Sequence, residues 1–338
     1  MIDSDSWSPE LRLRGLDQDK RAVSLSVLAD SSQEEDLSEP ANCSGLGRIR
    51  HFTHTTANGW PDNPLPWLPA RRHLGAGAVP SAGCKAQVFQ NSVCNWRCWY
   101  CYVPFSLLRG DPAKSRFVTA DDMVDMYLGL DDRPVVLDLS GGQPDLVPEW
   151  VVWTMEALRE RHAQDRVFLW SDDNLSNDYL FRYLTEDQLE VLSSYQGYGR
   201  VGCFKGFDDT SFAFNTGALP ELFDRQFTLF ERLLTIRPDT YAYVTFTAPA
   251  IPPTGAISAM RRFADRLQAL DDTLLARTTP LRIDVFTPVA PRMRSAHQTA
   301  LTVQEAMVDA WNTVLAERGV VPLFDQPMAE LTTAGHRV

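Results

Sequence analysis

From residue 85 onward, short apolar runs alternate with longer amphipathic stretches. The runs are rich in β-branched and aromatic residues, which favours strands, and they lie at residues 86–90, 135–140, 167–170, 200–205, 240–247 and 281–286. Apolar residues recur at helical spacing over residues 119–130, 148–162, 220–236, 256–270 and 302–318, and more weakly over 177–192. This alternation predicts parallel βαβ units in a barrel-like or doubly wound α/β sheet. Functional residues are then expected just after the strands, at their C-terminal ends.

The first 84 residues lack this rhythm, and we expect them to form an irregular extension ahead of a barrel at 85–320 and a tail at 321–338. Residues 30–40 are acidic and serine-rich with few apolar groups, which predicts a flexible loop or linker. Residues 59–69 contain four prolines together with Trp60 and Trp67. This composition favours polyproline geometry over helix or sheet, and predicts an arm laid across another surface.

Charge and hydropathy narrow the possible partners. The chain has 32 Lys and Arg against 44 Asp and Glu, a net charge of −12, which argues against nucleic acid as the main partner. No apolar run approaches the roughly 18 to 20 residues of a membrane span, and the first 20 residues carry charges where a signal peptide needs an apolar stretch. The sequence therefore predicts a soluble, cytoplasmic protein without a membrane partner.

Three of the six cysteines lie within eight residues, directly after the first expected strand. Cys94, Cys98 and Cys101 have the spacing C-x3-C-x2-C. Unrelated buried thiols are one interpretation, and a zinc site is another, although structural zinc normally takes four ligands and no partnering Cys or His pair is evident. Three thiolates on one loop can also hold three irons of a [4Fe-4S] cluster, leaving the fourth iron open to another ligand. We expect the remaining cysteines, at 43, 84 and 203, to be free thiols.

This spacing, with the aromatic Tyr100 before the third cysteine, resembles the radical S-adenosylmethionine (SAM) superfamily. The resemblance extends over residues 85 to about 290 and implies a partial (β/α)6 TIM-type barrel. It also implies that Cys94, Cys98 and Cys101 bind a [4Fe-4S] cluster whose open iron is chelated by SAM. A reductase such as flavodoxin or ferredoxin would supply the electron that releases a 5′-deoxyadenosyl radical, since in such enzymes the cofactor carries the hard chemistry. Shielding that radical would fall to the arm at 59–69, which we expect over the barrel edge or mouth.

The segment after the second expected strand strengthens the resemblance. Ser140, Gly141, Gly142 and Gln143 are similar to the family's Gly-Gly-Glu-Pro segment, which receives the methionine ammonium, and glycine allows close backbone approach. Gln143 stands in place of the acid, so the hydrogen bond would lose its charge assistance unless Asp145 compensates. An ordinary strand-to-helix turn is the alternative interpretation of this segment.

Two later strand ends carry further candidates. Asp172 and Asn174 follow the third strand and resemble a family segment that contacts the ribose and amino acid ends of SAM, although a helix cap would explain one of them equally well. Lys205 ends the fourth strand, where the family often places a lysine near the SAM carboxylate; a structural ion pair is the alternative. Arg292 after the sixth strand could meet an anion at the barrel mouth, or lie in a solvated loop.

The sequence predicts the enzyme class more narrowly than the substrate. Residues 205–208 and 214–218 are similar to proteins of the pyruvate-formate-lyase-activating-enzyme-like branch. We expect hydrogen abstraction from a small-molecule, peptide or protein substrate, since the acidic composition and the absence of an RNA-binding module disfavour RNA. The alternative is a non-catalytic zinc- or Fe-S-binding interaction protein.

Overall fold

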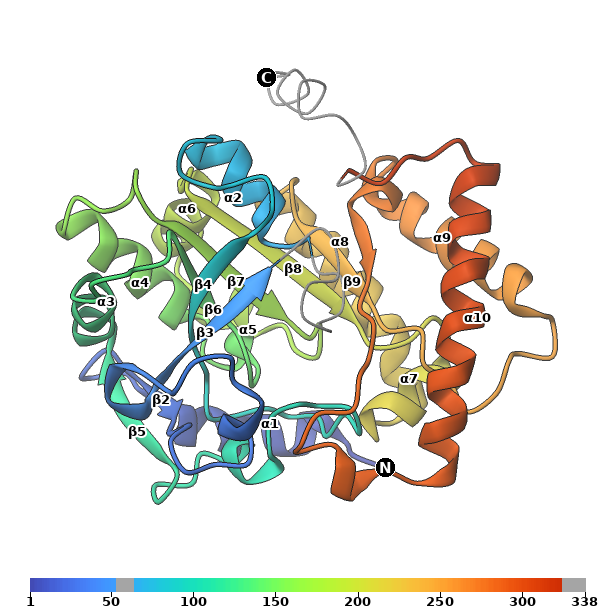
Figure 1. Cartoon of the computed structure of the whole chain (residues 1–338), viewed down its shortest axis with the longest axis horizontal. Helices are drawn as coiled ribbons and strands as arrows, with labels where there is room; N and C mark the ends of the chain where they lie inside the picture. The colour runs from blue at the N-terminus through green and yellow to red at the C-terminus, as the bar shows by residue number, and fades with distance from the viewer. Residues whose placement is uncertain (53–63, 324–338) are drawn as a thin grey trace.

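The main sheet of this computed structural model, which describes residues 1–52 and 64–323, is a curled half-barrel (Figure 1). Its seven strands have the order β10-β9-β8-β7-β6-β4-β3, and neighbours are parallel except for the antiparallel pair β3 and β4. The strands are β3 (Gly47–Phe52), β4 (Cys84–Phe89), β6 (Val136–Leu139), β7 (Phe168–Asp173), β8 (Tyr198–Phe204), β9 (Tyr241–Val244) and β10 (Thr278–Pro280). This architecture confirms the α/β class and the partial TIM-type barrel.

Helices connect the parallel strands and cover the outer face of the sheet (Figure 1). They are α3 (Ala120–Leu128), α4 (Glu149–Glu160), α5 (Tyr179–Tyr183), α6 (Glu186–Ser194), α7 (Asp209–Thr216), α8 (Phe223–Ile236), α9 (Ala256–Leu270) and α10 (Ser295–Glu317). Their apolar stripes pack on the sheet in one large buried cluster, which includes Trp150, Phe204, Phe230 and Trp311. The helical spacing in the sequence therefore reports the faces that form this core.

Two expected elements differ in detail. The strand expected at residues 281–286 is wrong, because β10 lies just before it and the chain leaves the sheet after the hydrogen bond from Leu281 N to Val244 O. The backbone of Ile283 bonds instead to the side chain of Gln304 on α10. The weak helix at 177–192 is two helices, since Thr185 begins α6 with a capping box.

The extension contributes regular structure as well as loops. Helix α1 (Ser4–Gly15) leads into a small antiparallel sheet of β1 (Leu16–Asp17), β2 (Ala22–Ser26) and β5 (Ser115–Thr119). Strand β3 then joins the edge of the main sheet, so part of the extension completes the barrel. The structure therefore gives residues 1–52 more order than the sequence indicated.

The described part of the proline-rich arm is a helix rather than an extended segment. Helix α2 (Trp67–Leu74) has Pro69 in its first turn, where a missing N–H costs no hydrogen bond. Trp67 and Leu68 pack against the first residues of the strands, such as Val136 and Phe168. Helix α2 thus lies at the N-terminal end of the barrel, with α1 at the other end (Figure 1). The described part of the arm therefore does not cover the mouth, which was one of the two places expected for it, the other being the barrel edge. Trp60 and residues 59–63 lie outside the described residues, as do residues 324–338 of the expected tail.

Within the described ranges, none of the helices combines the length and apolar character that a membrane span requires.

Candidate functional site

A cavity of about 250 Å³ opens at the C-terminal ends of the parallel strands. It brings together the loops that follow β4, β6, β7 and β8, as the βα alternation predicts. The sequence-predicted residues in its wall are Cys94, Cys98, Tyr100, Cys101, Gly141, Gly142, Gln143, Asp172, Asn174 and Lys205. Ser140 is buried at the end of β6 and does not line the cavity.

Neighbouring segments fix the backbone of the cysteine loop. Backbone N–H groups of Arg97 and Trp99 donate to carbonyl oxygens at the end of α7, at 3.2 and 3.1 Å. The guanidinium of Arg292 donates to the carbonyl oxygens of Cys98 and Cys101, so this arginine supports the loop, which replaces both earlier interpretations of it. Two segments distant in sequence, the end of α7 and the loop that carries Arg292, therefore fix the position of the cysteine loop.

Burial sets the protonation state of the thiols. It raises the pKa of Cys98 to about 12 and also raises the pKa of Cys101, because a thiolate without a partner is costly in a low-dielectric site. The described residues contain no group of three His, Cys, Asp or Glu side chains arranged around a single metal ion. Thiolates are the usual ligands of an iron–sulfur cluster, so the donor chemistry of the three cysteines is compatible with one, and binding it would release their protons.

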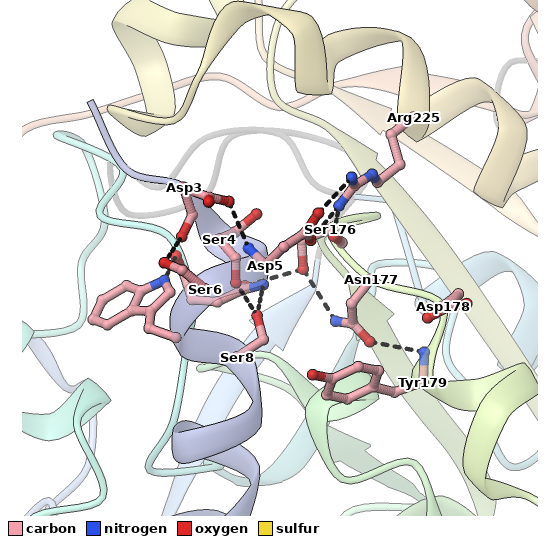
Figure 2. A network of polar contacts seen from close by, with 12 residues as sticks. Asp3, Ser4, Asp5, Ser6, Ser8, Ser176, Asn177, Asp178, Tyr179 and Arg225 are labelled. Carbon is pink, nitrogen blue, oxygen red and sulfur yellow. Dashed lines mark hydrogen bonds and ion pairs between the residues drawn. The ribbon is translucent and has the colours of Figure 1, made fainter.

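Helix α1 supports this loop through a polar network (Figure 2). The side chain of Asn95, between the first two cysteines, donates to Ser8 Oγ at 3.0 Å and accepts from Ser176 Oγ at 3.0 Å. Figure 2 shows Ser176 beside Asn177 and the Asp5–Arg225 ion pair, in which Arg225 also donates to the Ser176 carbonyl. The N-terminal helix is thus a structural support of the candidate site, which sequence reasoning had missed.

The two glycines after β6 are required by their surroundings. Gly141 and Gly142 have φ of 83° and 65°, in the left-handed region that other residues avoid. A Cβ on Gly142 would lie 2.3 Å from Asn91 O and 2.6 Å from Val93 O, a distance that real Cβ atoms do not reach. The segment therefore packs tightly on the chain that leads into the cysteine loop.

Gln143 is buried and held from two sides. Its Nε2 donates to Asp173 Oδ1 at 2.6 Å, and its Oε1 accepts from Asn174 N at 2.9 Å. Arg200 lies 3.7 Å from Asp173 and 2.7 Å from Asp145, and all three charged side chains are nearly inaccessible. Asp145 does not line the cavity, so the suggestion that it compensates for the neutral Gln143 is wrong; Asp173 is the carboxylate beside that residue.

The polar residues after β7 face the cysteine loop. Asn174 Nδ2 lies 3.8 Å from Cys94 Sγ and 3.3 Å from Asn95 Oδ1. In the described part of the chain Asn174 Oδ1 is buried without a hydrogen-bond partner, a deficit that a bound ligand would remove. Asp172 accepts from Trp170 Nε1 at 2.8 Å, and burial raises its pKa.

Lys205 presents a half-buried cation to the cavity. Burial alone would lower its pKa, but the ionisable groups around it, Cys203, Tyr100, Cys98 and Asp172, raise that pKa overall. Its ammonium forms no ion pair with any residue in 1–52 or 64–323, so the structural ion pair considered from sequence is not found there. Such a cation favours an anionic ligand group.

Sequence reasoning missed the side of the cavity formed by the extension. Gln33, Asp36, Leu37 and Ser38 line the cavity, and the 3₁₀ turn Glu34–Asp36 lies within this segment. Residues 33–38 are hereafter the strap. Asp36 accepts from the backbone N and the Oγ1 of Thr287, both at 2.8 Å. The segment predicted to be a flexible linker is therefore hydrogen-bonded to the cavity rim.

Strand β3 adds two arginines to the same side. Arg48 and Arg50 line the cavity and share a strand face with Phe52, which is packed inside the barrel. The alternation of two arginines with apolar Ile49 is a period-2 signal that could have indicated a strand with charged residues facing inward.

Comparison with known proteins gives distant structural similarities. Neither the protein-family models nor the curated proteins contain a match to the sequence. SuiB of Streptococcus suis, solved with its precursor peptide SuiA, matches over 70% of this chain and 47% of its own, with 11% identity and a TM-score of 0.46. TsrM of Kitasatospora setae, a radical S-adenosylmethionine methyltransferase solved with cobalamin and a [4Fe-4S] cluster, matches over 70% and 42%, with 18% identity and a TM-score of 0.39.

A further SuiB structure, solved with S-adenosylmethionine, matches over 55% of this chain and 37% of its own, with 13% identity and a TM-score of 0.39. The chain therefore spans less than half the length of these structures. With such low identities and TM-scores below 0.5, function has to be argued from the cavity of this chain.

Proposed function

We propose that this chain is a radical SAM enzyme, which binds a [4Fe-4S] cluster and SAM and abstracts hydrogen from its substrate. One observation carries the proposal: the three cysteines lie in one cavity with the polar residues that end β6, β7 and β8. These residues are far apart in sequence and meet only because parallel strands place their C-terminal ends together. A zinc-binding interaction module would not need this second group of residues.

In this proposal each wall of the cavity has its own task. Cys94, Cys98 and Cys101 hold the cluster, with Tyr100 packed between the loop and β9 through a 3.0 Å contact to Thr245 Oγ1. When bound, cluster and SAM supply a 5′-deoxyadenosyl radical. The protein's own contribution is to bind, orient and exclude water.

Gln143 is proposed to receive the methionine ammonium. A carbonyl oxygen has two acceptor sites, and the bond from Asn174 N uses one of them on Gln143 Oε1. Asp173 accepts a hydrogen bond from the amide nitrogen of the same side chain and adds negative charge next to it. Ser140, Gly141 and Gly142 complete this turn. Ser140 lies outside the cavity wall, so its proposed role is to support the turn rather than to contact the cofactor.

The remaining contacts are assigned by charge and polarity. Lys205 is proposed to bind the SAM carboxylate, since its ammonium lines the cavity without an ion pair in the described chain. Asn174 and Asp172 are proposed to bind polar groups of the cofactor, which would give the buried Asn174 Oδ1 a partner. Each contact would satisfy a group that is costly to leave alone.

The narrower parts of the proposal concern branch, substrate and setting. We place the chain in the pyruvate-formate-lyase-activating-enzyme-like branch on the segments at 205–208 and 214–218. Its substrate is proposed to be a small molecule, a peptide or a protein, its electron donor a flavodoxin or ferredoxin, and its setting the cytoplasm.

Anaerobic reconstitution with iron and sulfide tests the proposal directly. Wild-type protein should bind iron, turn brown and form 5′-deoxyadenosine from SAM when dithionite is added, while replacing Cys94, Cys98 and Cys101 by Ala should remove all three signals. Cys43→Ala is the matched control, because this thiol does not line the cavity. Full iron content in the triple variant contradicts the proposal, and stoichiometric zinc without 5′-deoxyadenosine would instead identify the non-catalytic alternative.

A further inference from the structure

Arg48 is a buried cation on the wall of the cavity that the extension forms. It is 4% exposed and lies on β3, which is separated from β8 in the sheet by β4, β6 and β7. Because Arg48 faces the barrel interior like Phe52, its guanidinium is turned toward the cavity. It therefore lies on a different wall from Lys205.

The guanidinium of Arg48 is incompletely satisfied. It donates one hydrogen bond to the Tyr102 hydroxyl, and its carbon lies 5.0 Å from the centre of the Tyr102 ring. Its Nε is buried without a partner in the described residues. A guanidinium has five N–H donors, so most of the hydrogen-bonding capacity of Arg48 remains.

The other two arginines that line the cavity have carboxylate partners. Arg50 lies 3.4 Å from Asp138, and Arg282 lies 3.1 Å from Glu305. Arg48 has no carboxylate within 4 Å in residues 1–52 and 64–323. Because an unpaired buried charge is costly, this exception points to an anion that is supplied from outside the chain.

The number of cavity cations without an ion pair distinguishes this anion from the cofactor. Among the described cations that line the cavity, Arg48 and Lys205 are the two without an ion pair. SAM has a single carboxylate, which the proposed function assigns to Lys205. Asp138 and Asp172 act on Arg48 only from beyond 4 Å and leave its Nε without a partner in the described residues. A second anionic group can therefore bind there, and the other molecule that must enter the cavity is the substrate.

We propose that Arg48 binds a carboxylate of the substrate. This inference rests on the proposed function, because it assumes that the SAM carboxylate binds at Lys205. The planar fork of arginine can bind either a carboxylate or a phosphate, but a carboxylate carries a single negative charge, and Asp172 and Asp284 on the cavity wall would repel a dianion more strongly. The substrate class is thus narrowed to carboxylates, whether the group belongs to a small molecule or to a peptide.

Calorimetric titration with small acids tests this subsite. Propionate represents a free small molecule, N-acetylalanine a peptide C-terminus and N-acetylglutamate amide an acidic side chain; the neutral amide of each probe and inorganic phosphate complete the set. Titrations use wild type, Arg48→Met, Arg48→Lys and the matched control Arg282→Met, which removes a paired arginine from the rim. Thermal melting of each variant reports folding.

We expect at least one acid to bind wild type and its neutral amide to bind at least about 10-fold more weakly, a factor that corresponds to about 1.4 kcal/mol. Arg48→Met should lose this factor and Arg282→Met should keep it, while Arg48→Lys should fall between them because it retains the charge without the fork. The acid that binds most tightly identifies the source of the carboxylate.

Several results would overturn the inference: no acid binding wild type better than its amide, unchanged acid affinity in Arg48→Met, or phosphate binding more tightly than every acid. SAM affinity and 5′-deoxyadenosine formation are measured on the same variants, and loss of SAM binding in Arg48→Met would assign the arginine to the cofactor. The titrations are repeated on cluster-free protein. Acid binding there with no 5′-deoxyadenosine from reconstituted wild type would reject the radical SAM function and leave the carboxylate site standing.

Discussion

At the scale of single residues, the candidate site depends on how buried polar groups satisfy one another. The sequence marked Gln143 as a neutral replacement for an acid, and the structure supplies the reason why it is neutral here. The amide is needed because its Nε2 donates a hydrogen bond to Asp173 Oδ1 at 2.6 Å. The sequence could predict the position of Gln143 from its motif, but its partner comes from another strand and could not be inferred.

This contact reverses the simplest expectation for Gln143→Glu, which is a stronger bond to the methionine ammonium. The introduced carboxyl would face Asp173 and leave no donor between two buried acids, so we expect a loss of about 1–3 kcal/mol in the free energy of unfolding at pH 7. Burial and Asp173 would raise the folded-state pKa of this carboxyl, so the loss should shrink as pH falls and it becomes protonated.

Urea unfolding of Gln143→Glu and wild type at several pH values measures this. Gln298→Glu on the exposed surface of α10 is the control for a general pH effect. Equal stability of Gln143→Glu and wild type at pH 7 would show that Asp173 does not depend on the amide.

At the scale of elements, the errors of sequence reasoning share one physical cause. The strap has a composition typical of a linker, yet Asp36 binds Thr287, 251 residues away, and Gln33 donates to Gln90 at 3.1 Å. Residues 281–286 have the composition of a strand, yet their backbone partner is a side chain of α10. In both cases a long-range hydrogen bond decides the structure, and local patterns do not report such bonds.

The strap should open when its contact to the rim is removed. Asp36→Ala leaves the two donors of Thr287 without their acceptor, and we expect the opening free energy of residues 31–38 to fall by about 1–2 kcal/mol. Hydrogen exchange followed by mass spectrometry measures this, with Glu35→Ala as the control because that exposed side chain has the same charge in the same turn. Identical exchange in both variants would show that Asp36 does not hold the strap.

At the scale of the whole molecule, the βα alternation was sufficient to predict the barrel and the end at which functional residues gather. Residues 85–320 provided that alternation, and the cavity lies where it predicts. The sequence could not predict at which end of the barrel the arm packs, because its tryptophans indicate that they are buried but not against which residues. The structure places Trp67 at the N-terminal end, among Val136, Phe168 and Tyr241.

Removing this anchor should affect stability and spare the cavity. Trp67 is 5% exposed, so Trp67→Ala should cost about 3–5 kcal/mol in the free energy of unfolding, whereas Phe117→Ala, at 47% exposure, should stay within about 0.5 kcal/mol. 5′-Deoxyadenosine formed per bound cluster should be unchanged in the folded Trp67→Ala protein, because Trp67 itself does not line the cavity. A lower ratio in folded protein would connect the arm to the cavity after all.

The way the cavity wall is encoded has a consequence for how such a protein can change. The strap and β3 come before the first parallel strand, while the cysteine loop and the proposed cofactor contacts all lie between β4 and Lys205, the residue directly after β8. Under the proposed function, one stretch of the chain therefore contacts the substrate and a separate stretch contacts the cofactor. Recombination between β2 and β4 would exchange the strap and β3 and keep α1, which supports the cysteine loop, so new substrates could be acquired by a change in one stretch of the coding sequence.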